Sequence, residues 1–224
     1  MSGSGPVTRR IAARAPQEMA AAVRAAVAAL RAGELVVLPT DTVYGVGCDL
    51  WQPAAIARLY AAKQRPANLA VPVLVSAPRH VAQVAASLPE AFDALVARFW
   101  PGGLTLVVPR RPEVPDILCA GGPTVAVRMP DHPLALALIE AMGGALAVTS
   151  ANLSGRPAPA EADQALADLD GRVALVLDGG RCPGGLASSV LDLSQHPPVL
   201  LRAGPLEVAA LRALLPDCRS AAAG

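Results

Sequence analysis

Residues 34–49 read ELVVLPTDTVYGVGCD, and this stretch decides the type of fold. Its first part, Glu34–Pro39, is a short apolar run, which indicates a buried strand. A polar turn of threonine and aspartate at 40–42 follows, and 43–47 then contains two glycines. Strand ends that open into glycine-containing loops are where α/β sheets place their ligands. The stretch therefore predicts an α/β protein with a binding site at a strand end.

The rest of the chain alternates between strand and helix patterns on both sides of this stretch. Helical spacing of apolar residues predicts helices at 17–32, 53–63, 78–86, 90–99, 133–142, 160–169 and 207–215. Short apolar runs predict further strands at 71–75, 104–108, 125–128, 145–149, 173–177, 190–193 and 199–201. Several strands follow one another directly, so a twisted mixed parallel/antiparallel sheet with packed helices is expected rather than a doubly wound parallel sheet.

The expected organisation is a single domain at 15–215, with flexible tails at 1–14 and 216–224. Hydrophobic residues make up 53% of the chain, but alanine accounts for much of this figure, so the composition is that of an ordinary globular domain. Apolar runs are too short for a membrane span, and the N-terminus has no apolar signal core. We therefore expect a cytoplasmic protein without a membrane partner.

The charge balance and the cysteines exclude two further classes. A net charge of +1 gives no dominant basic face, which argues against a nonspecific coat on nucleic acid. The four cysteines are widely spaced, lack any C-x-x-C pair and do not cluster with histidine. Structural zinc is therefore not expected, and free thiols are.

Only one of the 19 basic residues is a lysine, Lys63. A coding bias toward arginine would deplete lysine everywhere, but it does not explain why the remaining one stands at this position. It precedes Gln64-Arg65-Pro66 at the end of an expected helix. A solvated helix end is one interpretation, since cations favour that end of the dipole. The other is an anion site, because lysine offers a point charge and arginine a planar fork for phosphate oxygens.

Polar clusters also stand at other strand ends. Thr149–Gly155 follows one strand, Arg128 ends another and Arg202 ends the last. Each cluster has a structural alternative, because threonine and serine cap helices and asparagine makes turns. Known phosphate signatures are absent from the sequence: there is no G-x-x-x-x-G-K-[ST], and the dinucleotide fingerprint is broken at Leu50.

Together these segments resemble the YrdC-like family, the threonylcarbamoyl-AMP synthases. They occur in the family's order, from about residue 17 to 215: PTDTVYGVGCD at 39–49, KQRP at 63–66, PGGLT at 101–105, VAVRMPDHP at 125–133, TSANLSG at 149–155, SSVLDL at 188–193 and LRAG at 201–204. The resemblance implies a mixed sheet around a large, positively charged central cavity.

It also implies an activity, the joining of L-threonine, bicarbonate and ATP into L-threonylcarbamoyl-AMP and pyrophosphate. A downstream tRNA-modifying threonylcarbamoyl transferase complex would then use the product to make threonylcarbamoyladenosine in tRNA. By the family pattern, threonine is held by Thr42, Arg128, Ser188 and the backbone of Val148. ATP, with Mg²⁺ expected beside it, is held by Lys63, Arg65, Thr124, Ser150, Asn152 and Arg202. Lys63 and Arg65 are the predicted catalytic residues.

The sequence departs from the family pattern in two segments. After K-x-R-P the family often has N-P-L-I-x-H, whereas 68–76 is longer here and has no histidine, so that Ser76 stands in its place. At 157–160 the sequence is PAPA, without the hydroxyls of the family's P-S-P-T. These changes leave open a noncatalytic nucleotide- or RNA-binding member of the same fold. A weak contact with RNA is a separate expectation for the partners of this protein. The carbamoyl-adenylate domains of hydrogenase maturation proteins are a third possibility, but they carry zinc fingers that are absent here.

Overall fold

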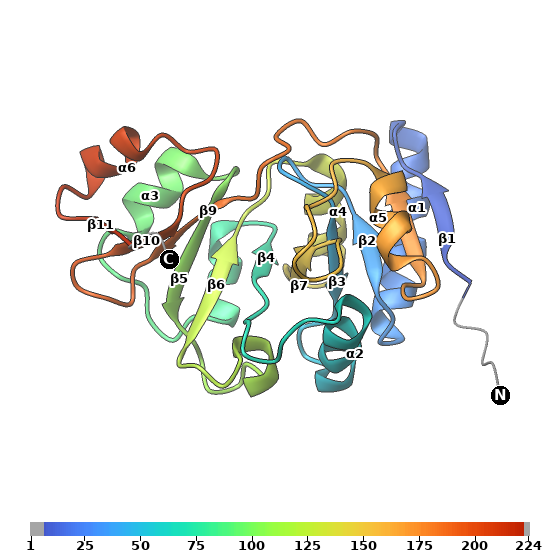
Figure 1. Ribbon diagram of the computed structural model, residues 1–224, viewed down its shortest axis with the longest axis horizontal. Coiled ribbons are helices and arrows are strands. Elements are labelled where there is room, and N and C mark those ends of the chain that lie inside the picture. The colour runs from blue at the N-terminus through green and yellow to red at the C-terminus, as the bar shows by residue number, and fades with distance from the viewer. Residues whose placement is uncertain (1–6, 222–224) are drawn as a thin grey trace.

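The 34–49 stretch forms a hairpin inside a sheet that holds every strand of the described residues, 7–221 of a computed structural model (Figure 1). The strands are β1 (Arg9–Ala12), β2 (Val36–Leu38), β3 (Gly45–Cys48), β4 (Val73–Val75), β5 (Leu104–Pro109), β6 (Thr124–Arg128), β7 (Ala145–Ser150), β8 (Leu175–Asp178), β9 (Ser189–Asp192), β10 (Val199–Arg202) and β11 (Arg219–Ser220). They lie in the order β1-β8-β2-β3-β7-β4-β6-β5-β9-β10-β11. The hairpin therefore lies well inside the sheet, away from both of its edges.

The strand directions are mixed, which confirms the predicted fold class. Five neighbouring pairs are parallel, namely β1/β8, β2/β8, β4/β6, β5/β9 and β10/β11. The other five, β2/β3, β3/β7, β4/β7, β5/β6 and β9/β10, are antiparallel. The sheet runs from β1 to β11 without closing on itself.

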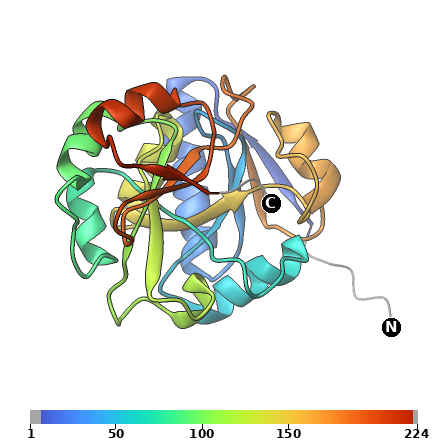
Figure 2. The same cartoon turned by 60° about the vertical axis from the view of Figure 1, so that its left-hand side comes forward.

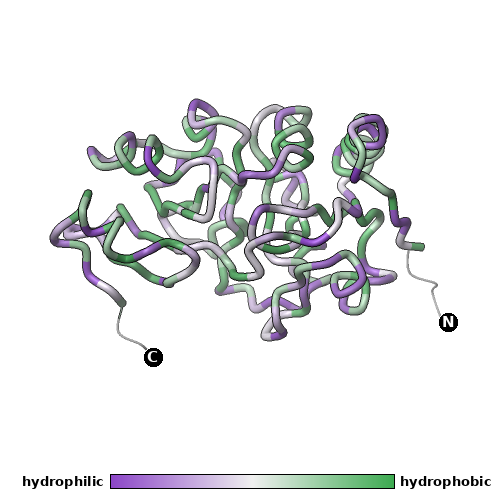
Figure 3. The backbone as a smooth tube through the Cα atoms, turned by 90° about the horizontal axis from the view of Figure 1, so that it is seen from above, coloured by the Kyte–Doolittle hydropathy of each residue, from purple (hydrophilic) through white to green (hydrophobic). Residues whose placement is uncertain are grey.

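Helices cover both faces of this sheet (Figure 2). They are α1 (Pro16–Arg31), α2 (Pro53–Lys63), α3 (Phe92–Phe99), α4 (Pro133–Ala141), α5 (Ala162–Leu169) and α6 (Val208–Leu214), with short 3-10 helices η1 (Pro78–Gln83) and η2 (Asp116–Cys119). The tube in Figure 3 alternates between hydrophobic and hydrophilic colours along these helices, as amphipathic helices on a sheet should. No helix in the described part of the chain is long and apolar enough to cross a membrane.

The position of β2 between two hydrophobic cores explains why its sequence is apolar without alternation. Val36 and Leu38 belong to one core, shared with α1 and α4, whereas Val37 belongs to the core on the opposite face. Successive side chains of a strand point to opposite faces, so a strand covered on both sides is apolar throughout. Burying each such side chain contributes about 1.5–3 kcal/mol.

Glycine is required where β3 lies against β7. A Cβ added at Gly45 would meet Val148 Cγ1 at 2.5 Å, and one at Gly47 would meet both the backbone and side chains of β7 at 3.1–3.2 Å. A real Cβ does not approach another atom as closely as 2.5 Å, so the G-V-G segment of the hairpin serves close packing. This closeness brings Thr149 and Ser150 beside the hairpin turn.

The ends of the chain differ from the prediction. The expected flexible tail at 1–14 instead includes β1, which pairs in parallel with β8, and part of the expected C-terminal tail forms β11 against β10. Both strands are short and mainly exposed, so they lack the apolar alternation that would reveal them. Residues 1–6 and 222–224 of those predicted tails lie outside the described residues. The helix expected at 78–86 is the shorter 3-10 helix η1.

Candidate functional site

A cavity of about 490 Å³ lies across the central strands of the sheet. The hairpin turn and the segment after α2 contribute to its wall, together with the neighbouring strands β7, β4, β6, β5, β9 and β10. Its lining residues are Thr40, Thr42, Val43, Gly45, Arg65, Asn68, Leu69, Ala70, Pro72, Leu74, Thr105, Ala126, Arg128, Val148, Thr149, Ser150, Ala187, Ser188, Val190, Leu201 and Arg202. This lining contains three arginines and no carboxylate. Its electrostatic character therefore favours anionic ligands.

The turn after β2 is organised by its own hydroxyl groups. Thr40 Oγ1 donates to Val43 O at 2.7 Å, and it lies 3.0 Å from Thr42 Oγ1. Thr42 N and Val43 N in turn donate to Thr40 Oγ1 at 3.2 and 3.3 Å. The Thr40 hydroxyl thus holds the turn through bonds to its backbone, and this turn places Thr42 at the cavity.

Arg128, at the end of β6, is held in place by three different acceptors. Its Nη1 donates to Thr42 Oγ1 at 2.9 Å, its Nη2 to Asp41 Oδ1 at 2.5 Å, and its Nε to Gly102 O at 2.8 Å. Burial lowers the pKa of Arg128, while the Asp41 carboxylate raises it. Two further N–H groups of the guanidinium are not used by these three bonds, so a bound carboxylate can still be met by a pre-oriented fork.

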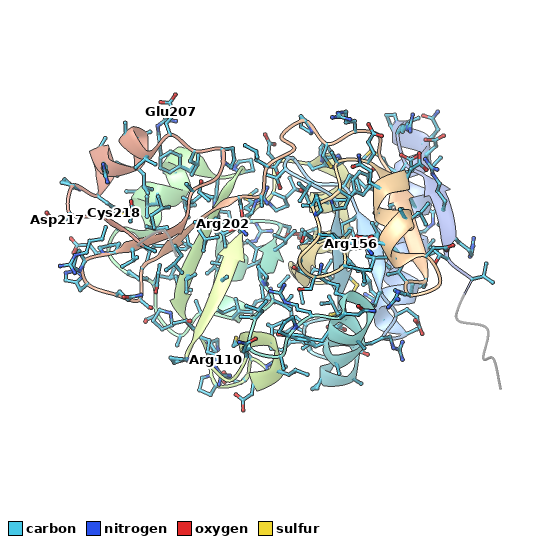
Figure 4. All side chains as sticks on the ribbon, viewed as in Figure 1. Arg110, Arg156, Arg202, Glu207, Asp217 and Cys218 are labelled. Carbon is cyan, nitrogen blue, oxygen red and sulfur yellow. The ribbon has the colours of Figure 1, made fainter. Side chains whose placement is uncertain are left out.

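A second hydroxyl cluster lies across the cavity, where β5, β9 and β10 meet. Thr105 Oγ1 is 2.8 Å from Ser188 Oγ, and Arg202 Nε donates to Ser188 O at 2.9 Å. Figure 4 shows Arg202 near the middle of the molecule, whereas Arg110 and Glu207 lie toward its periphery. Burial lowers the pKa of Arg202, and the positive charge of Arg128 lowers it further. The two cations thus act on the same space.

The K-x-R segment divides its two cations between different environments. Gln64 caps α2 in the left-handed conformation, with φ 50° and ψ 43°, and so reverses the chain between them. Arg65 then reaches the cavity wall, where Nε donates to Leu69 O at 3.0 Å and Nη2 to Ala70 O at 2.7 Å. Burial lowers the pKa of this guanidinium.

Lys63 lies behind the cavity wall rather than on it. It is only 1% exposed, and its Nζ donates to Asn152 O at 2.6 Å and also to Ser150 O. Desolvation lowers the pKa of Lys63 to about 8, with Arg65 adding to the effect. The Lys63 ammonium group therefore does not face the cavity, where the predicted contact with ATP phosphates would have to form.

Seven of the ten predicted site residues line the cavity together: Thr42, Arg65, Arg128, Val148, Ser150, Ser188 and Arg202. Lys63, Thr124 and Asn152 do not. Thr124 lies at the start of β6, at the opposite end of that strand from Arg128, and Asn152 turns its amide nitrogen to Leu153 O and Arg156 O. Four further polar lining residues, Thr40, Asn68, Thr105 and Thr149, had no role assigned from the sequence, although Thr40, Thr105 and Thr149 lie in the quoted motifs.

The two segments that depart from the family pattern, 68–76 and 157–160, differ in what they contribute to the cavity. Asn68 lines the cavity, although no role was assigned to it from the sequence. Ser76 lies elsewhere, because its Oγ donates to Glu140 Oε2 at 2.5 Å, so it does not replace the missing histidine in the cavity. The PAPA segment at 157–160 adds no lining residue, and it is tied to the hairpin by Tyr44 N, which donates to Pro159 O at 2.8 Å.

The residues present do not form a metal site of their own. The described residues contain no group of three or more histidine, cysteine, aspartate or glutamate side chains that could hold a metal ion. Mg²⁺ prefers oxygen ligands, above all carboxylates and phosphates. The lining offers no carboxylate, so the protein side of the cavity does not fit Mg²⁺.

Known proteins resemble this chain over most of its length. The Sua5/YciO/YrdC family model, described as telomere recombination, matches residues 28–204. Threonylcarbamoyl-AMP synthases of Pyrococcus abyssi and Bacillus subtilis are each 40% identical, over 197 and 210 residues. Those matches cover 88% and 93% of this chain, but only 58% and 59% of the relatives. The chain thus spans about three fifths of the length of these two. A relative from Mycobacterium tuberculosis, also 40% identical, is matched over 88% of its own length.

Solved structures agree with the sequence relatives. A P. abyssi Sua5 complexed with L-threonine matches with a TM-score of 0.91 and 37% identity, over 96% of this chain and 63% of that one. E. coli YciO matches with a TM-score of 0.80 and 26% identity, over 91% of this chain and 98% of that one. The family model covers well over half of the chain. The protein therefore belongs to the Sua5/YciO/YrdC family.

Proposed function

We propose that this protein is an L-threonylcarbamoyladenylate synthase, an enzyme of the nucleotidyltransferase type. The observation that carries the proposal is a single cavity lined by three arginines and two clusters of hydroxyl groups, with no carboxylate. The proposed reaction joins L-threonine, bicarbonate and ATP, and each of these three substrates carries an anionic group. Relatives named threonylcarbamoyl-AMP synthase, and one solved with L-threonine, support the same proposal.

Threonine is assigned to the side of the cavity that contains the hairpin turn. The unused N–H groups of Arg128 are directed to its carboxylate, with Thr42 beside them. Ser188, from the hydroxyl cluster across the cavity, and the backbone of Val148 complete the threonine site. Because Asp41 and Gly102 already orient the guanidinium, binding does not have to order that side chain.

ATP is assigned to the side formed by Arg65, Ser150 and Arg202. Arginine forks suit phosphate oxygens, and a serine hydroxyl can donate to one more. Thr124 and Asn152 lie off the lining, so their contacts with ATP remain predictions from the family resemblance. Any Mg²⁺ in the reaction would be held through the oxygens of the nucleotide.

The chemistry needs positioning rather than a protein nucleophile. The neutral amine of threonine adds to bicarbonate with loss of water and gives an N-carboxylate. An oxygen of that carboxylate attacks the α-phosphorus of ATP while the bond to the bridging oxygen breaks, and pyrophosphate leaves. The nucleophile is already anionic, so the protein has to align two anions and stabilise charge on the leaving group. Arg65 and Arg202 are the cations available for that task.

The product is a reactive mixed anhydride, so a downstream consumer is expected. We assign that role to a threonylcarbamoyl transferase complex acting on tRNA, with at most weak RNA contact by this protein, in the cytoplasm. Any direct RNA contact would be secondary, since the net charge is only +1.

Release of pyrophosphate from ATP, with threonine and bicarbonate each omitted in turn, tests the proposal. We expect release only when all three substrates are present. An Arg128→Lys variant should lose rate by about a hundredfold, because a point charge does not replace a fork. Binding of ATP without any threonine-dependent release would instead favour the noncatalytic nucleotide-binding alternative.

A further inference from the structure

The last residue of α2 contacts the 150–154 loop with both its side chain and its backbone. Lys63 Nζ donates to the carbonyl oxygens of Ser150 and Asn152, and Lys63 O accepts from Ser154 N at 2.9 Å. Three alternate residues of the loop are therefore attached to one residue of the helix. Ser150, whose carbonyl oxygen points back to the lysine, is also the loop residue that lines the cavity.

Among the described residues, the hydrogen-bond partners of the Lys63 ammonium group include no carboxylate. The nearby Asp168 is occupied elsewhere, since its Oδ2 accepts from Leu153 N at 2.9 Å and its Oδ1 from Arg156 Nη1 at 2.6 Å. A buried charge must be hydrogen-bonded if it is to be retained, and here the acceptors are two backbone carbonyls. The loop and the lysine therefore depend on each other.

We propose that Lys63 is a positioning residue, which holds the Ser150–Asn152 loop against the ATP side of the cavity from behind. It acts through the loop and does not itself contact the nucleotide. This assignment rests on the proposed function for the identity of the ligand, ATP. It divides the K-x-R segment into a cation that shapes the wall, Lys63, and a cation that faces the ligand, Arg65.

The geometry also explains why a lysine is needed. An ammonium group donates in tetrahedral directions, so one nitrogen can meet two carbonyls that converge from the same loop. A guanidinium is larger and planar, and its N–H groups diverge. With 1% exposure there is no space behind the loop for the extra atoms, so Lys63→Arg is expected to push the loop forward.

Because the chain has a single lysine, its accessibility can be measured in the unmodified protein. The ligand-free wild-type protein is treated with an amine-acetylating reagent, and labelling of Lys63 is followed by peptide mass spectrometry. The same protein in denaturant gives the reference rate. We expect labelling at least about a hundredfold slower in the folded state, since reaction has to wait for local opening. Labelling at nearly the denatured rate, together with protection by ATP, would place Nζ on the cavity wall and overturn the proposal.

Variants test the effect on the loop. In ligand-free Lys63→Met we expect amide hydrogen exchange across 150–154 to be at least about tenfold faster than in wild type. ATP affinity should fall by about tenfold or more, while the dissociation constant for threonine stays within about twofold. Lys63→Arg should share the loss of ATP affinity.

Arg65→Met is the matched control, because Arg65 lines the cavity while its guanidinium donates to Leu69 O and Ala70 O, which lie outside the 150–154 loop. It should weaken ATP binding and leave exchange across 150–154 unchanged. Wild-type exchange across this loop in Lys63→Met would contradict the positioning role. None of these readouts depends on turnover. A failure of the synthase proposal, seen as no threonine-dependent pyrophosphate release, is therefore distinguishable from a failure of this one.

Discussion

At the scale of single residues, the site contains two buried cations that are stabilised in different ways. Arg128 has a carboxylate partner, Asp41, whose side chain is itself mostly buried. Lys63 is bonded to backbone carbonyls alone. A charge paired with a carboxylate stays charged over a wide pH range, whereas a charge held by neutral dipoles is more easily lost. The two cations should therefore respond differently to mutation and to pH.

Removing the partner of Arg128 should be costly. In Asp41→Ala the buried guanidinium loses its counter-charge, and Asp131 N loses an acceptor. We expect unfolding in urea to show a loss of about 3–5 kcal/mol, and calorimetry to show weaker threonine binding. Asp217→Ala, at an exposed position, is the control and should change stability by less than about 0.5 kcal/mol. A loss below about 1 kcal/mol in Asp41→Ala would show that the pair does not hold Arg128.

Lys63 should make stability depend on pH in a defined window. Its pKa in the folded protein, about 8, lies below the ordinary value of 10.5, so between these values the unfolded chain binds more protons. The folded state is therefore favoured as the pH rises from 8 to 10.5, by up to about 3 kcal/mol. The stability difference between wild type and Lys63→Met isolates this effect, because other titrating groups are common to both. Urea curves at pH 7.5, 9 and 10 that shift in parallel would contradict it.

At the scale of elements, α2 shows what sequence patterns can and cannot predict. Both of its bounds, Pro53 and Lys63, were predicted, because a proline at the first turn and apolar spacing mark them. Gln64, which follows, is left-handed, but this position is not a glycine, so nothing in the sequence indicated the reversal. Because this reversal was not foreseen, Lys63 and Arg65 were expected to bind the same anion. The structure instead places them on opposite sides of the cavity wall.

The same distinction applies to the rest of the site. Residues on recognisable strand ends, such as Thr42 and Arg128, were predicted because motif and topology agree. Asn68 was not, since it lines the cavity only through the path of a connecting segment. Thr149 belongs to a polar cluster recognised at a strand end but received no role, and it lies beside the hairpin because β7 packs closely against β3. β1 could not be predicted because its strand character comes from a partner about 165 residues away, and not from its own sequence.

The residue that caps η2 has a strained backbone conformation, and a substitution can relieve that strain. Ala120 has φ 52°, the left-handed region in which a Cβ costs about 1–2 kcal/mol. Glycine loses some of that advantage through its freedom in the unfolded chain. Ala120→Gly should therefore raise stability by about 0.5–1 kcal/mol, measured by urea unfolding. Ala94→Gly, at an exposed position inside α3, should lower it by a similar amount, and equal effects of the two substitutions would refute the strain argument.

At the scale of the whole molecule, the first strand is connected to the site through a chain of contacts. Arg10 and Arg14 bond to Asp178 at the end of β8, with Nη2–Oδ2 distances of 2.7 and 3.1 Å. The loop that follows Asp178 continues to Gly184, whose N–H donates to Asp41 O at 3.1 Å. The sheet edge at the far right of Figure 1 thus supports the turn that orients Arg128.

Removal of residues 1–14 should test this connection. The shortened chain loses β1 and both arginine partners of Asp178, so we expect a loss on the order of 2–3 kcal/mol in urea unfolding. It also exposes the edge of β8, which should raise light scattering at high concentration. A chain without residues 1–6 keeps every described contact and is the reference. Equal stability of the two shortened chains would show that β1 is dispensable.

The pairing of β1 with β8 also sets an order of events during synthesis. Ribosomes add roughly 5–20 residues per second, and the partner of β1 lies about 165 residues downstream. β1 therefore waits roughly 8–30 s for its place in the sheet, while the strands of the hairpin can pair within a few seconds. Its two adjacent arginines, Arg9 and Arg10, keep this waiting segment charged, which discourages pairing with other nascent chains.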